Sequence, residues 1–388
     1  MKKEILYISP NKIKENSASS IHILNMCNAA YDLNYDITLI SSSDNKLEEV
    51  KTEIKKFYGE FKFKLFSINN FFLNKGNELI ITFFLIYLYL FKFINIKNKY
   101  IISRNLYTAF FISFFLKKRV IYETHIVEKY FRSYLQSKII LKNNNTTICI
   151  SDVLKDLLIK RYNINNNNNI YTLHDSANII NLSKDLINNN KNKIFNNLNI
   201  PRKYKLIGYF GGLYKGRGME LIVNLSYLKK DCFFLVFGGD IASINYWKNK
   251  IQTNNLIFMG NLKYSDVGLN LKSMDILLMP YQKKVYLSTT KTSTAEWMSP
   301  LKMFEYMSSN VPFISSKLKV LQEILVHNHN CLLAEPDKID DWSKAIDRLK
   351  RDSNLANLIS SNSYHEFKNN HTWQKRLEKI INFYDNTL

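Results

Sequence analysis

Short runs of apolar residues alternate with helix-like segments along most of the chain. In the first half these runs are 5–8, 36–40, 100–102, 120–122, 147–150 and 171–173, and a helical period covers 22–33. Apolar runs this short, separated by helices, are typical of parallel strands that are buried on both faces of a sheet. The pattern therefore predicts a doubly wound α/β domain over residues 1–180.

The same alternation restarts after a polar stretch at 181–200, which we interpret as a linker or an inter-domain helix. Beyond it we expect strands at 205–210, 233–237, 256–259 and 275–279, with helices at 219–228, 241–249 and 265–272. A chain of 388 residues is long enough for two domains. We therefore predict a second Rossmann-like domain over 201–364. Because ligands bind beyond the carboxyl ends of such strands, we expect the two domains to face each other across a cleft.

The net charge of +21 favours an anionic partner, although a merely soluble basic surface would also carry it. The lysines are scattered, and no helix-turn-helix, zinc-finger or RNP-like pattern occurs, so we expect no nucleic-acid partner. A phosphorylated substrate and the anionic inner face of a membrane remain. The four cysteines lie far apart, which predicts buried free thiols in a reducing compartment. The first residues lack a signal-peptide pattern, so we expect a cytoplasmic protein that is peripheral to the membrane.

The most apolar segment, 79–91, carries no charge over 13 residues. A membrane-spanning helix needs about 20 residues, so this segment is too short to span. Two interpretations stay open. The segment is either a buried helix of the α/β domain or an exposed face that enters the membrane interface, with Lys92, Lys97 and Lys99 at its edge.

The segment 208–218, between a predicted strand and helix, is rich in glycine and carries two cations. Gly211 and Gly212 allow backbone N–H groups to approach an anion, and the helix start adds a positive dipole. Lys215 and Arg217 add formal charge, and arginine binds phosphate in bidentate fashion. A diphosphate is the natural ligand, and a glycine turn required only for packing is the alternative. The segment lacks the Lys and Ser/Thr of a P-loop, and no G-x-G-x-x-G pattern occurs.

A second segment, 299–307, predicts a helix start with Ser299 at the N-cap and Pro300 at the first helical position. The first N–H groups of this helix, beginning at Leu301, are suited to a second phosphate. Lys302 and Glu305 are three residues apart and lie on one helix face. They form either a surface ion pair or a functional pair, with Lys302 on phosphate and Glu305 on the ribose hydroxyls.

Histidines follow two predicted strands of the first domain. His125 lies at the carboxyl end of the run 120–122, where both a structural and a functional role are open. We assign Ser19, Ser20 and His22, which follow the first strand, to the acceptor side. No His/Cys/carboxylate grouping has the spacing of metal ligands and no D-x-D motif occurs, so we predict no metal.

Together these segments resemble the family 4 glycosyltransferases, which are retaining enzymes with the GT-B fold. The subgroup is one with Ser-Pro-Leu-Lys in place of the first glutamate of the E-x7-E motif. The residues that carry the resemblance are 208–218, 299–307, 311–314, 321–325 and the terminal helix around Trp373. The resemblance implies that the C-terminal helix, within 365–388, crosses back onto the N-terminal domain. It also implies sugar transfer from a nucleotide-diphosphate donor with retention of anomeric configuration.

The resemblance also assigns roles to single residues. Glu305 stands at the second glutamate of the motif and contacts the donor ribose, and Arg217 takes the place of the family's diphosphate-binding lysine. His125 matches the histidine that contacts the transferred sugar. Two departures stand out, because Trp297 occupies the position of the first glutamate and Gly212 replaces an arginine. The predicted catalytic residues are His125, Arg217 and Lys302.

We therefore expect a metal-independent hexosyltransferase with no cofactor besides its nucleotide-sugar substrate. Its acceptor is a saccharide or a lipid-linked hydroxyl, in bacterial surface polysaccharide assembly. Arg217, Lys302 and the glycine-loop amides would stabilise the departing nucleoside diphosphate. Two alternatives remain: another GT-B enzyme such as a sugar-nucleotide epimerase or a phosphorylase, and a non-catalytic GT-B partner subunit at the membrane. The missing first glutamate favours the partner subunit, whereas the retained donor residues favour the enzyme.

Overall fold

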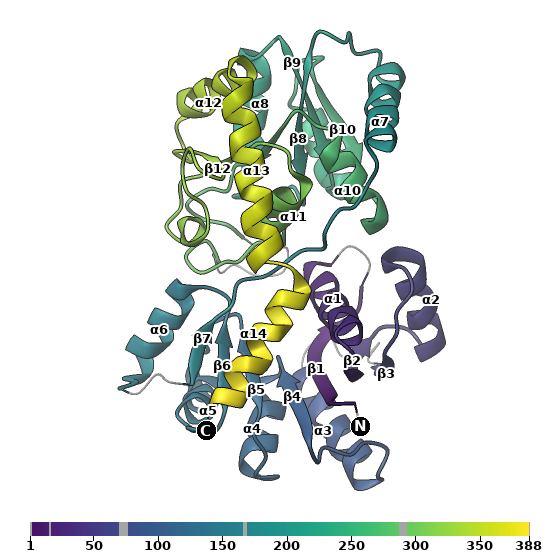
Figure 1. Ribbon diagram of the computed structural model, residues 1–388, viewed down its shortest axis with the longest axis vertical. Helices are drawn as coiled ribbons and strands as arrows, with labels where there is room; N and C mark the ends of the chain where they lie inside the picture. Colours follow the sequence, from purple (N-terminus) through teal and green to yellow (C-terminus); the bar gives the residue numbers. More distant parts are fainter. Residues whose placement is uncertain (1, 15–16, 70–76, 166–168, 287–292, 388) are drawn as a thin grey trace. The chain divides into compact units, whose positions relative to one another are not determined.

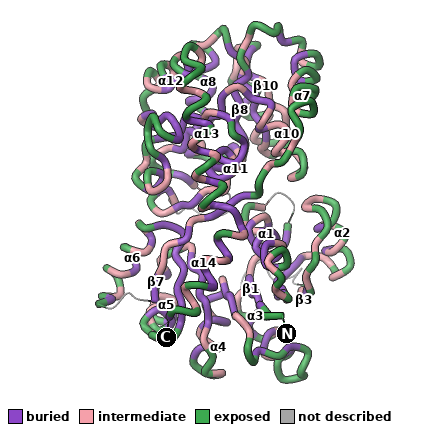
Figure 2. The backbone as a smooth tube through the Cα atoms, in the orientation of Figure 1, coloured by how far each residue is buried: buried purple, intermediate pink, exposed green. Residues whose placement is uncertain are grey.

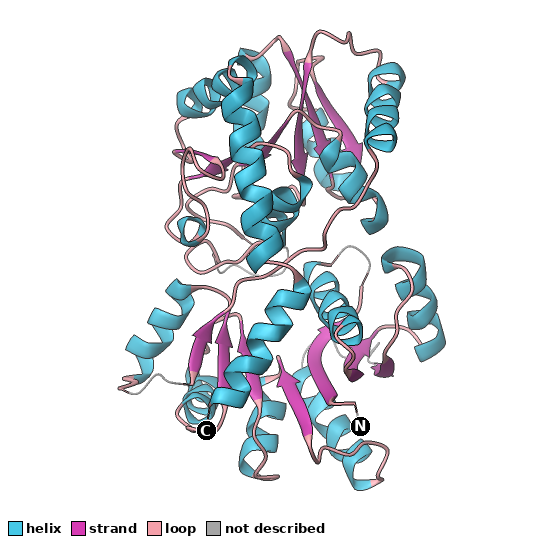
Figure 3. Cartoon of the chain, viewed as in Figure 1, coloured by secondary structure: helices cyan, strands magenta, loops and turns pink. Residues whose placement is uncertain are grey.

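The computed structural model describes residues 2–14, 17–69, 77–165, 169–286 and 293–387. The chain divides into two compact units, one formed by Met1–Ser176 with Trp373–Leu388 and the other by Ala177–Thr372. Each unit is built on one parallel sheet with helices between successive strands (Figures 1 and 3). The central strands of both sheets are buried while the outer sides of the helices are exposed (Figure 2). The predicted α/β class with two parallel sheets is confirmed.

The first unit contains a seven-stranded sheet in the order β3-β2-β1-β4-β5-β6-β7. Its strands are β1 Glu4–Lys12, β2 Asp36–Ser43, β3 Lys64–Asn69, β4 Lys99–Ser103, β5 Ile121–Thr124, β6 Thr146–Cys149 and β7 Ile170–Thr172. Its helices are α1 Ala18–Asp32, α2 Leu47–Tyr58, α3 Asn77–Leu90, α4 Leu106–Phe114, α5 Tyr130–Ile140, α6 Asp152–Tyr162 and α14 Trp373–Asn386. The sequence pattern missed β3 because this edge strand buries only Leu65 and so has no apolar run.

The C-terminal helix α14 packs on α1 of the first unit, as the family resemblance implied. Phe383 of α14 stacks on Tyr171 with ring centroids 4.0 Å apart, and Arg119 donates a hydrogen bond to the carbonyl of Thr387 at 2.9 Å. The return to the first unit begins at Trp373 and not at residue 365. The residues before it complete α13, Ser353–Asn370, which packs on α11 in the second unit.

The second unit contains a six-stranded sheet in the order β10-β9-β8-β11-β12-β13. Its strands are β8 Lys205–Phe210, β9 Cys232–Phe237, β10 Leu256–Gly260, β11 Ile276–Met279, β12 Phe313–Ser316 and β13 Leu332–Ala334. Its helices are α7 Lys184–Asn197, α8 Met219–Leu228, α9 Ile241–Lys248, α10 Tyr264–Lys272, α11 Leu301–Ser309, α12 Ile339–Arg351 and α13, with a 3₁₀ turn at Leu321–Glu323. β8 and β11 are neighbours, so the loops that follow them share one edge of the sheet.

The polar segment predicted as a linker forms α7 and belongs to the second unit. Asn190 donates a hydrogen bond to Ser273 Oγ at 2.9 Å, and Lys191 forms an ion pair with Asp275 at 2.8 Å. These contacts attach α7 to the segment between α10 and β11. Residues 181–200 are therefore part of the folded second unit.

All four cysteines are free and buried, as their apolar surroundings predict. Within the described ranges, no helix is both long and apolar enough to cross a membrane.

Candidate functional site

The glycine loop follows β8 and leads into α8. Gly211 has φ +138°, and a Cβ there would lie 2.9 Å from both Cε and Nζ of Lys302. Gly218, at the N-cap of α8, has φ +86°, and a Cβ there would lie 2.0 Å from the carbonyl oxygen of Pro280. Both positions require glycine, for the close approach as well as for the backbone conformation. The glycine loop therefore contacts Lys302 of α11 on one side and Pro280, which follows β11, on the other.

Helix α11 begins at Leu301, and Pro300 is its N-cap. The prediction of Ser299 at the N-cap is wrong by one residue, because Pro300 has an extended backbone, with φ −78° and ψ 125°. Proline has no side-chain acceptor, so the N-cap residue makes no side-chain hydrogen bond to the first turn. The N–H groups at this helix start carry the positive end of the helix dipole.

Two cations from these segments share a pair of tyrosines. The ammonium of Lys302 lies 3.9 Å from the ring centroid of Tyr209 and 5.2 Å from that of Tyr281. Arg217 Nη1 donates a hydrogen bond to Tyr281 Oη at 2.8 Å. In the part of the chain that the structure describes, Lys302 Nζ and Arg217 Nε are buried with no hydrogen-bond partner. The rings of the tyrosines stabilise the cations but do not neutralise them.

The electrostatics around Lys302 and Arg217 are suited to an anion. Burial lowers the pKa of Lys302 well below its usual value, and the positive charge of Arg217 lowers this pKa further. Burial also lowers the pKa of Arg217, but Tyr281 and Tyr209 more than offset this, so that its pKa is raised and its guanidinium stays charged. A buried cation without a counter-ion is costly. A phosphate group at this position would supply the missing negative charge.

Glu305 lies one turn along α11 from Lys302. Burial raises the pKa of Glu305 to about 7, and the charge of Lys302 opposes this rise. The alternative of a surface ion pair between the two is wrong, because Lys302 is only 7% exposed and makes no ion pair in the described part of the chain. A partly buried carboxylate beside an anion site is suited to accept hydrogen bonds from hydroxyl groups.

The predicted donor residues do not all gather at this point. Gly211, Arg217 and Lys302 are brought together, whereas Lys215 is exposed, with its ammonium 5.9 Å from the ring centroid of Tyr286. Sequence reasoning assigned no role to Tyr209 or Tyr281. Only their positions in the sequence could have indicated a role. Tyr281 follows β11, and Tyr209 lies near the end of β8, the strand that pairs with β11.

In the first unit, His125 belongs to a buried cluster around Glu123. Glu123 lies in β5 and its side chain is fully buried. Its carboxylate accepts hydrogen bonds from Arg376 Nη1 at 3.0 Å and from His125 Nε2 at 2.9 Å. His22 Nε2 is 3.1 Å away, at an ion-pair distance without the geometry of a hydrogen bond. The cluster joins β5, α1 and the C-terminal helix α14.

The charges within this cluster balance one another. Burial alone would raise the pKa of Glu123, but Arg376 and His22 hold it well below its usual value. Burial lowers the pKa of His125 to about 4, and the nearby charge of Arg104 contributes. His125 is therefore neutral at neutral pH and its Nε2–H donates to Glu123. The His125 side chain is 28% exposed, so it can still contact a ligand.

The residues assigned to the acceptor side are largely turned inward. His22 is 1% exposed, and its Nδ1 lies 2.9 Å from Asp175 Oδ1. Ser20 is fully buried and its Oγ accepts a hydrogen bond from the backbone N–H of Lys14. Ser19 Oγ is hydrogen bonded to Ser17 Oγ at 2.8 Å and is partly exposed. Ser20 and His22 are therefore buried in this structure, and their assignment to the acceptor side stays a prediction.

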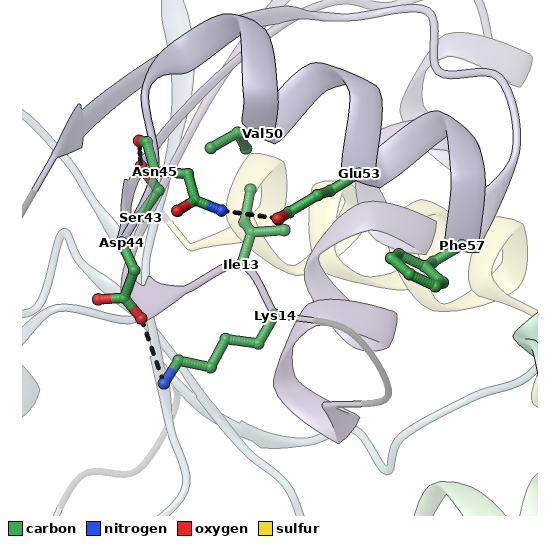
Figure 4. Close-up of a pocket in the computed structure, with 8 residues that line it drawn as sticks. All are labelled: Ile13, Lys14, Ser43, Asp44, Asn45, Val50, Glu53 and Phe57. Atoms are coloured by element: carbon green, nitrogen blue, oxygen red, sulfur yellow. Dashed lines mark hydrogen bonds and ion pairs between the residues drawn. The ribbon is translucent and has the colours of Figure 1, made fainter. Parts of the chain in front are cut away.

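A pocket of about 180 Å³ lies in the first unit where β1 and β2 end and α2 passes (Figure 4). Its lining residues are Ile13, Lys14, Ser43, Asp44, Asn45, Val50, Glu53 and Phe57. Asn45 donates to Glu53 at 2.6 Å, and Lys14 pairs with Asp44 at 3.4 Å, so these groups satisfy one another. Ligand pockets usually measure about 300–1,000 Å³, so this one is small for a saccharide. Across the described ranges, no three His, Cys, Asp or Glu side chains are grouped to hold a metal ion.

Comparison with known families places the glycine loop and α11 inside a recognised domain. Residues 190–366 match the family of glycosyl transferases group 1. This segment contains the glycine loop, Tyr281 and α11, and it covers less than half of the chain. No curated protein sequence matches the chain.

Solved structures match nearly the full length of the chain. A glycosyltransferase from Rickettsia africae has a TM-score of 0.74 at 17% identity, covering 100% of this chain and 98% of that one. Anabaena HepE in complex with UDP and glucose has a TM-score of 0.71 at 14% identity, covering 98% and 99%. S. aureus TarM in complex with fondaparinux, alpha-GlcNAc-glycerol and UDP has a TM-score of 0.65 at 13% identity, covering 99% and 100%. The chain therefore has the two-domain α/β fold of the GT-B glycosyltransferases, and its group 1 segment supports a glycosyl-transfer function.

Proposed function

We propose that the protein is a retaining glycosyltransferase that moves a sugar from a nucleoside-diphosphate donor to a saccharide or lipid-linked acceptor. The observation that carries this proposal is the pair of basic residues, the half-buried Arg217 and the buried Lys302, beside a glycine loop and a helix start whose N-cap is a proline. The related fold of HepE was solved with UDP and glucose, and that of TarM with UDP and saccharides. These ligands support a nucleotide-sugar donor and a saccharide acceptor here.

The proposed chemistry assigns one task to each group. Arg217 and Lys302 stabilise the charge that grows on the departing diphosphate, together with the loop amides and the α11 N–H groups. Because these groups supply positive charge, we propose a reaction that needs no metal. Glu305 accepts hydrogen bonds from the ribose hydroxyls. His125, as a neutral imidazole, contacts a hydroxyl of the transferred sugar, and retention follows the family 4 resemblance.

We place this reaction in bacterial surface polysaccharide assembly, on the cytoplasmic face of a membrane. The net charge of +21 supports an anionic surface nearby. The second candidate is a non-catalytic GT-B partner subunit, which Trp297 favours because it replaces the first glutamate of the motif. A sugar-nucleotide epimerase or a phosphorylase is a third.

Donor turnover separates these candidates. Hydrolysis of a panel of uridine, guanosine and adenosine diphosphate sugars should reveal one preferred donor, and thermal shifts with the free diphosphates should rank the bases. Arg217→Ala and Glu305→Ala should each lower kcat/KM at least tenfold, which is about 1.4 kcal/mol of transition-state stabilisation. Lys215→Ala, in the same loop but exposed, is the matched control.

Two outcomes contradict the proposal in different ways. Near-wild-type activity of Arg217→Ala and Glu305→Ala would remove the donor-site assignment. A chain that binds diphosphates but turns over no donor, with or without added saccharides, would be a partner subunit. Formation of an epimerised nucleotide sugar would identify the epimerase, and release of a sugar phosphate on addition of inorganic phosphate would identify the phosphorylase.

A further inference from the structure

Helix α3 is apolar on every side, but only one side is buried. Ile81, Leu85 and Leu88 face the core of the first unit. On the opposite side, Phe83 is 67% exposed and Leu90 is 68% exposed. The segment 79–91 thus has one face in the core, as the buried-helix interpretation predicts, and one face outside the core. An outward face of this kind is unusual for a helix of a monomeric protein and indicates a binding surface.

Aromatic side chains extend this face beyond the end of the helix. Tyr87 stacks against Phe91 and Phe93, with ring centroids 4.8 and 6.0 Å apart. Phe91 and Phe93 are exposed, and so is Phe115 at the end of α4. The rings therefore support one another without being covered by the rest of the chain.

Both groups of aromatic residues lie at the same edge of the sheet. Helices α3 and α4 pack side by side, and each one ends shortly before the strand that follows it, β4 or β5. Their C-terminal ends therefore lie at the amino edge of the sheet (Figure 1). This end of α3 and α4 is largely exposed (Figure 2). We call this surface the α3–α4 patch, with the apolar members Phe83, Tyr87, Leu90, Phe91, Phe93 and Phe115.

The charge around the α3–α4 patch has a single sign. From residue 79 to residue 122 the chain has seven basic residues and no acidic one. Three of the seven are engaged within the protein: Lys99 with Glu4, Arg104 with Glu123, and Arg119 with the carbonyls of Tyr384 and Thr387. The other four are exposed lysines, namely Lys92, Lys97, Lys117 and Lys118. The patch thus combines exposed aromatic rings with exposed ammonium groups.

We infer that the α3–α4 patch binds the surface of an anionic phospholipid bilayer. Its rings enter the interfacial region, and its four lysines contact the lipid headgroups. A symmetric contact with a second copy would bring like charges together, so the charge disfavours this occupant. Helix α3 has 14 residues and lies in the interface without spanning the bilayer. The inference deepens the proposed function, because such a surface would hold the enzyme beside a lipid-linked acceptor.

Vesicle co-sedimentation of the full chain tests this inference without donor or acceptor. We expect binding to vesicles of phosphatidylcholine with phosphatidylglycerol to be at least tenfold tighter than to phosphatidylcholine alone, and to weaken at high salt. Phe83→Ser/Phe91→Ser/Phe115→Ser should lower the affinity at least tenfold, because all three side chains are exposed and contribute apolar area. Ile241→Ser/Tyr246→Ser, at exposed apolar positions of α9, is the matched control.

Lysine substitutions test how much the charge of the α3–α4 patch contributes to vesicle binding. The neutralised patch is Lys92→Gln/Lys97→Gln/Lys117→Gln/Lys118→Gln, and the control neutralises Lys203, Lys230, Lys248 and Lys250 in the second unit. Only the patch variant should lose the preference for phosphatidylglycerol. Equal binding by the patch and control variants would overturn the inference. A change of oligomeric state in the aromatic variant, without vesicles, would do the same and would assign the patch to a second copy.

Failure of this inference and failure of the proposed function give different results. Diphosphate binding in solution should be the same in the wild type and the aromatic variant. Vesicle binding should likewise survive Arg217→Ala.

Discussion

The two units differ in the side chains that surround their buried basic residues. In the first unit, Arg376 lies against the buried carboxylate of Glu123, and Asp175 pairs with His22. In the second unit, Lys302 lies over the ring of Tyr209 and Arg217 donates to Tyr281, and within the described residues Lys302 Nζ and Arg217 Nε have no hydrogen-bond partner. Buried charge is normally balanced within the protein. The pair of Glu123 and Arg376 is therefore balanced within the fold, whereas the missing counter-charge beside Lys302 and Arg217 supports the proposed anion site.

The pKa values express the same contrast. The pKa of Glu123 is lowered, which means that its surroundings favour the charged carboxylate. The pKa of Lys302 is also lowered, but for an amine this means that its surroundings disfavour the charged form. An equal direction of shift therefore has opposite meanings in the two units.

The largest expected effect is the loss of stability in Arg376→Met. The substitution leaves Glu123 buried without its guanidinium partner, so we expect a loss of about 3–5 kcal/mol. Differential scanning calorimetry of the full chain measures it as a fall in the midpoint of the first unit. The double variant Glu123→Gln/Arg376→Met should recover part of the loss. A fall equivalent to less than about 1 kcal/mol would contradict the structural role of this pair.

Lys302→Met should have the opposite effect on stability. It removes a buried cation that has no counter-ion, so the free protein should be as stable as the wild type or more stable by about 1 kcal/mol. The same variant should bind nucleoside diphosphate at least tenfold more weakly, because the phosphates of the ligand lose a charge partner. Calorimetric midpoints with and without diphosphate measure both effects. A destabilised free protein with unchanged affinity would make Lys302 a structural residue.

Glu305→Gln should change the pH dependence of stability. The pKa of Glu305 is raised to about 7 in the folded chain, above its ordinary value near 4.5, so the folded state holds an extra proton between these values. Wild-type stability therefore falls as the pH rises through this window. Glutamine does not titrate, so the variant should gain stability relative to the wild type from about pH 4.5 to about 7. Parallel unfolding curves of the two proteins across this window would argue against a buried carboxylate.

Lys215→Ala should have the smallest effect. Its ammonium is exposed and separated from the buried cations, and exposed charges contribute about 0–1 kcal/mol. Diphosphate affinity should therefore fall less than about threefold, and this fall should vanish at high salt. A loss of diphosphate affinity as large as that of Lys302→Met would mean that Lys215 contacts the bound phosphates directly.

The sequence predicted features that depend on neighbours in the chain. Strand β8 and helix α8 were predicted to the residue because a glycine turn separates an apolar run from a helical period. The glycine loop and α11 could likewise be interpreted from local chemistry. Their roles in donor binding, and that of His125, stay predictions.

Features that depend on distant contacts were missed. The pair of Glu123 and Arg376 joins residues 253 positions apart, and no local pattern signals it. The burial of His22 depends on the same cluster, and no local pattern predicts it. The contact of Lys302 with Tyr209 and Tyr281 depends on the pairing of β8 with β11, which no local pattern predicts.

Proton uptake when a nucleoside diphosphate binds is the most direct test of the role of Lys302. Burial lowers the pKa of Lys302 in the free protein, and a bound diphosphate should raise it, so the neutral amine should take up a proton on binding. Isothermal titration in buffers of different ionisation enthalpy counts this proton. We predict net uptake in the wild type and none in Lys302→Met. Tight binding with no proton uptake, unchanged in Lys302→Met, would contradict the claim that a bound phosphate stabilises the charged form of the buried Lys302.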